Sequence, residues 1–203
     1  MKIMHLCPPT IAFLLGFMLF STQAISQTNY SFQSGKMTIA GTSTLHDWVS
    51  DVTQINYTGN VQVGDQALAS IKNVKLTIPV EGIKSTKGKA MDKKTYGALN
   101  KEEYPKLECS LNSFKIQNNG TTFKITANGN LTIAGTTKPL TLNLSAQFTE
   151  DGNLQFTGSK ALKMTDFNID PPRALLGTLK TGDDITIEFT VLMKPTNGTA
   201  NTK

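Results

Sequence analysis

Two residues with catalytic chemistry, His46 and Asp47, stand side by side in the segment GTSTLHDW at residues 41–48. A histidine next to a carboxylate could transfer protons as a general acid or base. Adjacent residues of a strand point to opposite faces, however, so the two side chains cannot work as a pair there. No nucleophile elbow, metal-ligand spacing or phosphate-binding loop accompanies them. We therefore expect His46 to be structural and Trp48 to cover one end of the fold.

Cysteine is the other candidate nucleophile. Cys7 lies close to the N-terminus, which leaves Cys109 in a stretch that alternates like a strand. A catalytic cysteine needs a histidine brought near in space, and the second histidine of the chain, His5, also lies near the N-terminus. A lone cysteine in a strand is typically a small core residue. We expect no enzyme activity, no metal and no cofactor, and an enzyme that uses His46 or Cys109 is the least favoured hypothesis.

The N-terminus has the pattern of an export signal. A charged start, Met1-Lys2, is followed by the apolar run IAFLLGFMLF at 11–20 and by the small residues of 21–26. These are the three parts of a secretory signal peptide, and the apolar run is shorter than the ~20 residues that span a bilayer. We predict a signal peptide over residues 1–26, with cleavage after Ala24 or Ser26.

The basic residues are unevenly distributed along the chain. The formal net charge is +5, and much of the excess lies in one segment, Lys84–Lys101. Nucleic-acid binding is not expected, because Arg173 is the one arginine of the chain and no aromatic residues alternate with basic ones. The plain interpretation of the lysines is a solvated face. The alternative is transient contact with an anionic membrane surface, which attracts clustered lysines.

The clearest structural signal is a long β-hairpin over residues 123–148. Apolar and polar residues alternate along both arms, which run to and from a turn at Gly135–Lys138. A period of two sustained over this length means that one face of each strand is buried and the other is solvated. Each arm has about a dozen residues and is roughly 36–40 Å long, about twice the usual strand. Strands of this length and pattern need the long core of a sandwich or a barrel.

The rest of the chain continues this β pattern with a single break. Further strands are expected at Lys36–Thr44, Val49–Val63, Leu68–Val80, Lys106–Gln117, residues 154–164 and Asp184–Met193. Between the third and fourth strands, Asp92–Asn100 can form a short helix with Asp92 as its N-cap. Residues 166–182 form a long connection of the kind that often serves as a functional lid, and residues 195–203 are expected to be a disordered tail. The sequence predicts an all-β fold, an elongated eight-stranded antiparallel β-barrel with one short helix between strands three and four.

The alternation also predicts which side chains face an apolar interior. The expected lining is Phe123, Ile125, Leu131, Ile133, Leu140, Leu142, Leu144, Phe148, Phe156, Phe189 and Val191. Ala127, Gly129, Ala146 and Gly158 are small residues in the same phase, and they either leave room for a slim ligand or relieve strain where strands cross or bend. Lys160 shares the phase too, so the strand bends there or the ammonium reaches one end of the barrel. From the residues alone, a solid core is slightly favoured over a cavity.

Four stretches resemble the YceI-like family: GTSTLHDW at 41–48, MDKKTYGALNKEEYPKLECS at 91–110, GNLTIAGTTKPLTL at 129–142 and GTLKTGDDITIEFTVLMK at 177–194. The resemblance extends over about residues 28–194. It implies an exported bacterial protein with a lipocalin-like, eight-stranded barrel that binds polyisoprenoid lipids in its interior. The barrel domain is accordingly expected at residues 27–194.

With this resemblance, the favoured hypothesis is an exported lipid-binding protein, located in the periplasm or secreted. It would hold an isoprenoid lipid, either a polyisoprenoid or an isoprenoid quinone, in the apolar barrel interior as a carrier or reservoir. The alternative is a ligand-free β-barrel that acts as an envelope interaction or stress-related protein through its outer face. The sequence leaves the oligomeric state open.

Overall fold

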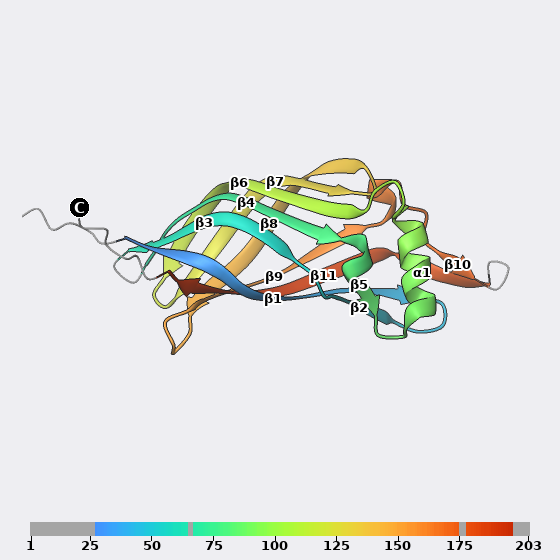
Figure 1. The fold of residues 1–203 in the computed structure, drawn as a ribbon, viewed down its shortest axis with the longest axis horizontal. Coiled ribbons are helices and arrows are strands. Elements are labelled where there is room, and N and C mark those ends of the chain that lie inside the picture. Colours follow the sequence, from blue (N-terminus) through green and yellow to red (C-terminus); the bar gives the residue numbers. More distant parts are fainter. Residues whose placement is uncertain (1–26, 65–66, 175–177, 197–203) are drawn as a thin grey trace, which may run out of the picture.

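The fold is a closed antiparallel β-barrel. The computed structural model describes residues 27–64, 67–174 and 178–196, and the predicted signal peptide at 1–26 lies outside them. The eight long strands in this part of the chain are β1 (Gln27–Ser43), β3 (Asn56–Gly64), β4 (Ala67–Pro79), β6 (Lys106–Asn119), β7 (Thr122–Ile133), β8 (Thr136–Phe148), β9 (Leu154–Lys163) and β11 (Leu179–Pro195). They pair in the order β1-β3-β4-β6-β7-β8-β9-β11, and β11 pairs back with β1, which closes the barrel (Figure 1). The predicted all-β, eight-stranded barrel is confirmed.

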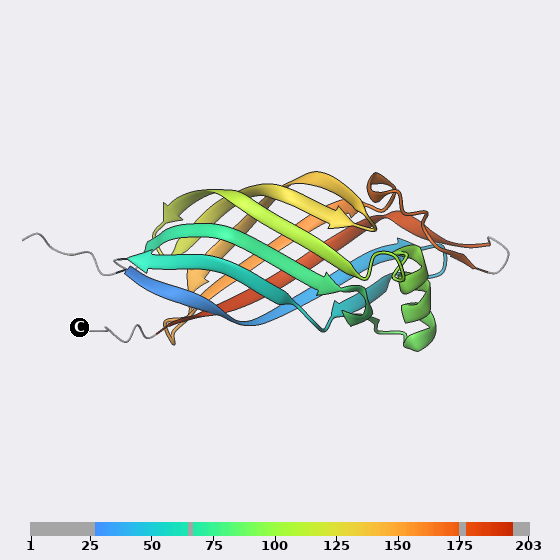
Figure 2. The same cartoon turned by 45° about the horizontal axis from the view of Figure 1, so that its top comes forward.

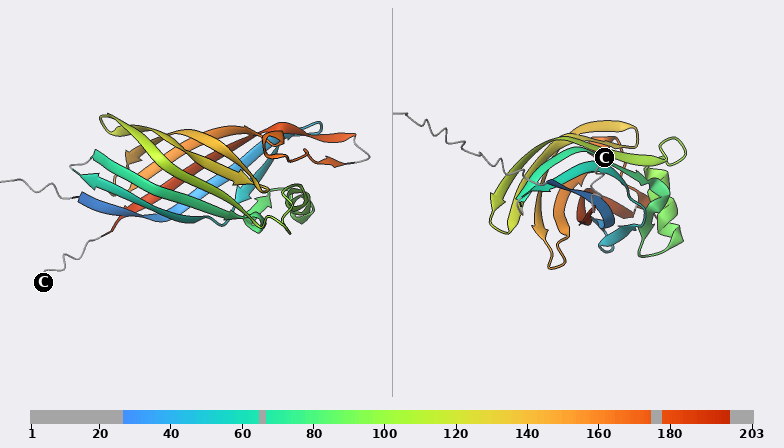
Figure 3. Two further views of the ribbon diagram at one scale, coloured as in Figure 1. Left: turned by 90° about the horizontal axis from the view of Figure 1, so that it is seen from above. Right: turned by 60° about the vertical axis from the view of Figure 1, so that its left-hand side comes forward.

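Smaller elements gather at one end of the barrel, which we call the helix end. The helix α1 (Lys89–Ala98) lies across this end, and the short strand β10 (Arg173–Ala174) extends beyond it, paired with the start of β11 (Figure 2, Figure 3). Also here are β2 (Trp48–Val52), η1 (Val80–Gly82), β5 (Ile83–Ser85) and η2 (Thr165–Phe167). We call the opposite end, where β1 begins and β11 ends, the far end. In the described part of the chain, no helix is long and apolar enough to cross a membrane.

The predicted second strand, Val49–Val63, is wrong as a single element. It is divided into β2 and β3, because the amide and the hydroxyl of Thr53 both donate to the carbonyl of Gly82, at 2.8 and 2.9 Å, and Thr53 takes no part in the sheet. β1 is longer than predicted and pairs with both pieces in turn. Its residues Gln27–Tyr30 pair with β3, and its residues Thr38–Gly41 pair with β2.

The helix begins earlier than predicted. Its N-cap is Gly88 and not Asp92, which instead lies in the first turn and is buried. The carboxylate of Asp92 accepts a 2.7 Å hydrogen bond from the amide of Ser85, and this bond fastens α1 to β5. The hydroxyl of Tyr96 donates to the carbonyl of Glu81 at 2.9 Å. The helix is therefore held on the barrel by these contacts, and no side chain caps its N-terminus.

The last strand is longer than predicted at both ends. β11 starts at Leu179, where it pairs with β10, and it ends at Pro195, where it pairs with β1. The amide and hydroxyl of Thr196 then donate to the carbonyl of Asn29, at 2.7 and 2.8 Å. The ordered barrel thus reaches residue 196 and not 194, while the rest of the predicted tail, residues 197–203, lies outside the described residues.

The barrel interior is apolar along its whole length. Two packed clusters line it, one around Phe123 toward the far end and one around Phe167 toward the helix end. Leu131 and Phe189 pack against both clusters, so the interior is continuous from one end to the other.

Candidate ligand-binding cavity

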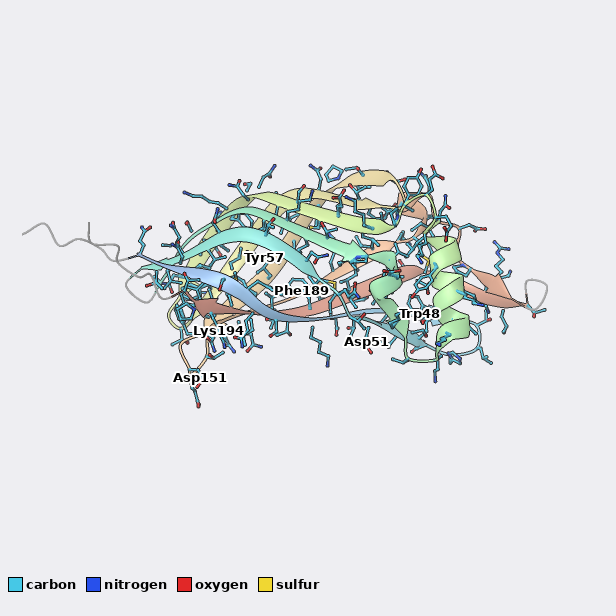
Figure 4. The ribbon with its side chains drawn as sticks, in the orientation of Figure 1. Trp48, Asp51, Tyr57, Asp151, Phe189 and Lys194 are labelled. Atoms are coloured by element: carbon cyan, nitrogen blue, oxygen red, sulfur yellow. The ribbon has the colours of Figure 1, made fainter. Side chains whose placement is uncertain are left out.

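A cavity of about 150 Å³ lies inside the barrel, surrounded by side chains from all eight long strands. We call it the barrel cavity. Nine of the eleven predicted lining residues surround it, namely Ile125, Leu131, Ile133, Leu140, Leu142, Leu144, Phe156, Phe189 and Val191. Figure 4 shows two residues of its wall, Tyr57 and Phe189, in the middle part of the molecule. The wall is almost entirely apolar, so it suits hydrocarbon and disfavours a polar group without a hydrogen-bond partner.

The other two predicted lining residues, Phe123 and Phe148, do not reach the barrel cavity. Their rings meet edge to face with centroids 5.7 Å apart, and the ring of Tyr30 lies 6.5 Å from that of Phe148. The hydroxyl of Tyr30 donates to the carbonyl of Gly152 at 2.9 Å. Phe123 and Phe148 lie near the ends of β7 and β8 that are farthest from the helix. The three rings therefore form an aromatic cluster toward the far end, which we call the aromatic plug.

A second cavity, of about 240 Å³, lies at the helix end. It shares five wall residues with the barrel cavity, which are Ile39, Ile83, Leu107, Ile133 and Ile187. Its outer wall is polar and basic and includes His46, Lys94, Lys163, Arg173 and Lys180. Because these five side chains are exposed, the cavity is reached from this end. We call the two cavities together the bore: it is apolar from the aromatic plug outward and becomes charged at its rim.

The two glycines of the predicted lining, Gly129 and Gly158, do not create this space. A side-chain carbon at Gly129 would collide with the backbone of Ser110 and come within 2.8 Å of the Cα of Leu111. At Gly158 it would lie 2.5 Å from the ring of Phe189. At Gly129 and Gly158 the prediction of room for a ligand is wrong, because neighbouring groups already fill the space of a side chain there. The alternative, that they relieve close contacts between strands, fits the structure.

Lys160 does not reach a barrel end, so that expectation for it is wrong. β9 stays paired with β11 at this residue, and its side chain lines the barrel cavity. The reason lies in β8 and β9, whose pairing covers only Leu144–Phe148 and Leu154–Gly158. Beyond that stretch the two strands separate, and the ammonium of Lys160 crosses to donate to the carbonyl of Thr141 at 3.1 Å. The hydrocarbon stem of Lys160 thus lines the cavity wall, while its ammonium group lies between β8 and β9 at the carbonyl of Thr141.

Sequence comparison agrees with this architecture. The profile of the YceI-like domain matches residues 21–193, which is most of the chain. The chain belongs to the YceI-like family. No curated protein sequence matches it. The resemblance seen in the four sequence stretches is therefore confirmed.

Solved structures share the barrel of this YceI-like protein at low sequence identity. BcnA of Burkholderia cenocepacia has a TM-score of 0.60 at 16% identity, over 78% of this chain and 95% of BcnA. A polyisoprenoid-binding domain from Saccharophagus degradans, implicated in plant cell wall breakdown, has a TM-score of 0.58 at 8% identity, over 85% of this chain and 100% of that domain. The YceI protein of Campylobacter jejuni has a TM-score of 0.51 at 19% identity, over 71% and 85% of the two chains. At these identities, the likeness establishes the fold.

Ionisable groups along the wall of this YceI-like barrel are either neutral or paired outside. Burial raises the pKa of Tyr57 to about 12 and the pKa of Cys109 to about 11. The carboxylate of Glu108 lies 3.1 Å from the ammonium of Lys75 and 3.2 Å from that of Lys106, and hydrogen bonds from these two lysines lower its pKa. At neutral pH, Tyr57 and Cys109 are therefore uncharged, and the charge of Glu108 is balanced by its two lysines.

Cys109 is expected to resist thiol reagents in the native protein at about pH 8. Only the thiolate reacts, and the raised pKa of Cys109 keeps the thiol protonated at that pH. The measurement is the rate of reaction with dithionitrobenzoate in a Cys7→Ser chain, with the same chain unfolded in guanidinium as the control. Rapid reaction of the folded chain would show that Cys109 is not the core residue the structure describes.

The same residue predicts a pH dependence of stability. Because its pKa is higher in the folded chain than in the unfolded chain, the folded state holds more protons between the usual thiol value and about 11. The free energy of unfolding is therefore expected to fall as the pH rises through this range. Urea unfolding at neutral and alkaline pH should show a smaller fall in Cys109→Ala than in the Cys109 chain. An equal fall in both chains contradicts the assignment.

The segment around His46 lies at the helix end. The Nδ1 atom of His46 lies 2.9 Å from the backbone carbonyl oxygen of Asp47, and both side chains are exposed. The Nε1 of Trp48 donates to the carbonyl of Thr42 at 3.1 Å, and its ring covers Gly41. Trp48 lines the helix-end cavity, so its predicted position at one end is confirmed. Among the described residues, no three His, Cys, Asp or Glu side chains gather into a metal site.

The sequence pattern predicted nine of the 28 residues in the wall of the barrel cavity, so about two thirds of the wall were missed. The missed residues from the first barrel strands include Met37, Ile39, Tyr57, Val61, Ile71, Val74, Leu76, Ile78, Leu107 and Leu111. The alternation of residues 74–78 was a usable signal for several of them. Within the predicted connection at 166–182, Phe167 and Ile169 are buried in the wall of the helix-end cavity. Their spacing by two could have revealed them.

Proposed function

We propose that the protein is an exported lipid-binding protein that holds a polyisoprenoid or an isoprenoid quinone in the bore as a carrier or reservoir. The observation that carries this proposal is the bore itself, which is apolar from the aromatic plug to a basic rim. Membership of the YceI-like family and the shared fold of a polyisoprenoid-binding domain support it. The proposed mechanism is sequestration, so no residue is assigned a catalytic role. The predicted signal peptide supports a periplasmic or secreted location.

The dimensions of the bore favour a thin chain over a compact ligand. Ordinary ligand pockets have roughly 300–1,000 Å³, whereas the barrel cavity has about 150 Å³ and shares five wall residues with a second cavity of about 240 Å³. A polyprenyl chain is narrow and has no polar groups along its length. Burial of one five-carbon unit contributes roughly 4 kcal/mol, at ~0.8 kcal/mol per carbon. A few units would therefore reach the limit of realistic affinities, and the depth of the bore sets the chain length that fits.

The test is the identity of whatever leaves the purified protein on extraction with organic solvent. The full chain is produced with its N-terminal segment, purified without detergent, extracted and analysed by mass spectrometry. We expect an isoprenoid lipid in the extract and a non-covalent adduct of matching mass in native mass spectrometry. No lipid in the extract together with no adduct would favour the alternative, a ligand-free barrel with an envelope interaction or stress-related role.

A further inference from the structure

Two large apolar side chains are exposed on the described part of the molecule, and both lie at the helix end. Leu45 is 66% exposed in the loop between β1 and β2, and Val49 is 37% exposed on β2. Leu45 also lines the helix-end cavity. Single exposed apolar residues are common on proteins and need no explanation. These two, however, stand together at the rim through which the bore is reached.

The loop that carries Leu45 is fastened in place. The hydroxyl of Ser43 accepts hydrogen bonds from the amides of Leu45 and His46, at 3.3 and 3.2 Å. The amide of Thr44 donates to the carbonyl of Lys180 at 3.0 Å, and the amide of Lys180 donates to the hydroxyl of Thr44 at 3.2 Å. These bonds tie the loop to the start of β11. Leu45 is thus presented to solvent by an ordered backbone.

The same end carries exposed positive charge. The basic segment predicted from the sequence divides into two groups. Lys84 and Lys101 are held by Tyr96, with each ammonium 5.4 Å from the ring centroid. The remaining lysines are exposed and form no salt bridge within the described residues; they are Lys87, Lys89, Lys93 and Lys94. The acidic residue of this segment, Asp92, is buried, and the exposed acids nearest to Leu45 in the chain are Asp47 and Asp51.

We propose that the helix end docks on an anionic bilayer, with Leu45 inserted among the lipids and the lysines of α1 on the headgroups. Apolar side chains flanked by lysines are the combination that binds membrane interfaces. A protein partner fits less well, because stable protein interfaces bury about 1,200–2,000 Å², whereas the exposed large apolar groups here are two side chains. Docking itself is independent of the proposed function. If that function holds, docking also places the rim of the bore against the bilayer, so a lipid could enter without crossing water.

The test is sedimentation of the full chain with vesicles of phosphatidylcholine alone or of equal parts phosphatidylcholine and phosphatidylglycerol. Each lysine near an anionic surface contributes about 1 kcal/mol, so the triple variant Lys87→Glu, Lys89→Glu, Lys93→Glu should bind anionic vesicles at least about a hundredfold more weakly. It leaves Lys94, which lines the cavity, in place. Leu45→Asp should weaken binding about tenfold. The matched control is a second triple reversal at exposed lysines toward the far end, Lys72→Glu, Lys115→Glu, Lys124→Glu, which should change binding less than about twofold.

Each outcome bears on the proposal. It is supported if the wild-type chain binds only the anionic vesicles, binding weakens with salt, and the loss is confined to the helix-end variants. It is overturned if the chain binds neither kind of vesicle, if Leu45→Asp binds like the wild type, or if both triple reversals lose binding equally. Lipid extraction from the same preparations separates this result from the proposed function. Vesicle binding without extracted lipid supports docking and rejects the lipid-carrier proposal. Extracted lipid without vesicle binding supports the lipid-carrier proposal and rejects docking.

Discussion

Replacement of Leu142 by arginine is expected to reduce the lipid that co-purifies with the protein by at least about tenfold. Leu142 is 8% exposed and lies in the wall of the barrel cavity, opposite Ala127 of β7. An arginine there puts a long, charged side chain into an apolar bore, where a charge without a partner costs several kcal/mol. The side chain would obstruct the space for a lipid tail, and a loss of only ~1.4 kcal/mol already weakens binding tenfold. Solvent extraction and mass spectrometry of equal amounts of protein give the measurement.

The control for this variant is the neighbouring residue on the same strand. Asn143→Arg adds the same side chain on the outer face of β8, where Asn143 is exposed, and should leave the lipid content unchanged. Since a buried arginine could also unfold the barrel, Leu131→Trp provides a second, apolar obstruction of the barrel cavity. If Leu142→Arg and Leu131→Trp both fold and carry as much lipid as Asn143→Arg, the bore is not the binding site.

The face of each strand could be predicted because it depends only on the side-chain period of two. The hairpin of β7 and β8 illustrates this, since residues such as Ile125, Leu140 and Leu142 are inside as expected. The period does not give the height of a residue along the barrel axis. Phe123 therefore looked like Ile125 in the sequence, yet one belongs to the aromatic plug and the other to the cavity wall. Height depends on the stagger between neighbouring strands, which sequence patterns leave undetermined.

The position of Lys160 and the start of the helix could not be predicted from the sequence either, because both depend on contacts that the side-chain pattern of one strand or helix does not determine. Lys160 can reach the carbonyl of Thr141 because β8 and β9 separate after Gly158. The sequence of either strand alone does not indicate where this separation begins. The start of the helix was also misplaced. From the first turn, Asp92 reaches back seven residues to the amide of Ser85, whereas in the sequence the same aspartate looked like an ordinary N-cap.

Gly129→Ala is expected to lower the free energy of unfolding by about 3 kcal/mol or more, a large effect for one methyl group. The missing side chain of Gly129 points at the backbone of β6. The register between β6 and β7 shifts between Leu111 and Ser113, which leaves Asn112 outside the ladder. At this irregularity the carbonyl of Ser110 and the Cα of Leu111 occupy the place of a Cβ. Backbone atoms of a paired strand cannot move aside as a flexible side chain can, so β6 and β7 would have to separate locally.

The matched control is the same substitution at a glycine with open space around it. Nothing lies within 4 Å of a Cβ added at Gly97, in the last turn of α1, where alanine is the better helix former. Gly97→Ala should therefore raise stability by roughly 0.5–1 kcal/mol. Urea unfolding followed by the fluorescence of Trp48, the one tryptophan of the chain, reports both variants. If Gly129→Ala unfolds at the same urea concentration as the wild type, Gly129 does not lie against Ser110 and Leu111. The register of β6 and β7, and with it the inward placement of the bore residues on β7, would then be wrong, because a slip of one residue turns every side chain of a strand to the other face.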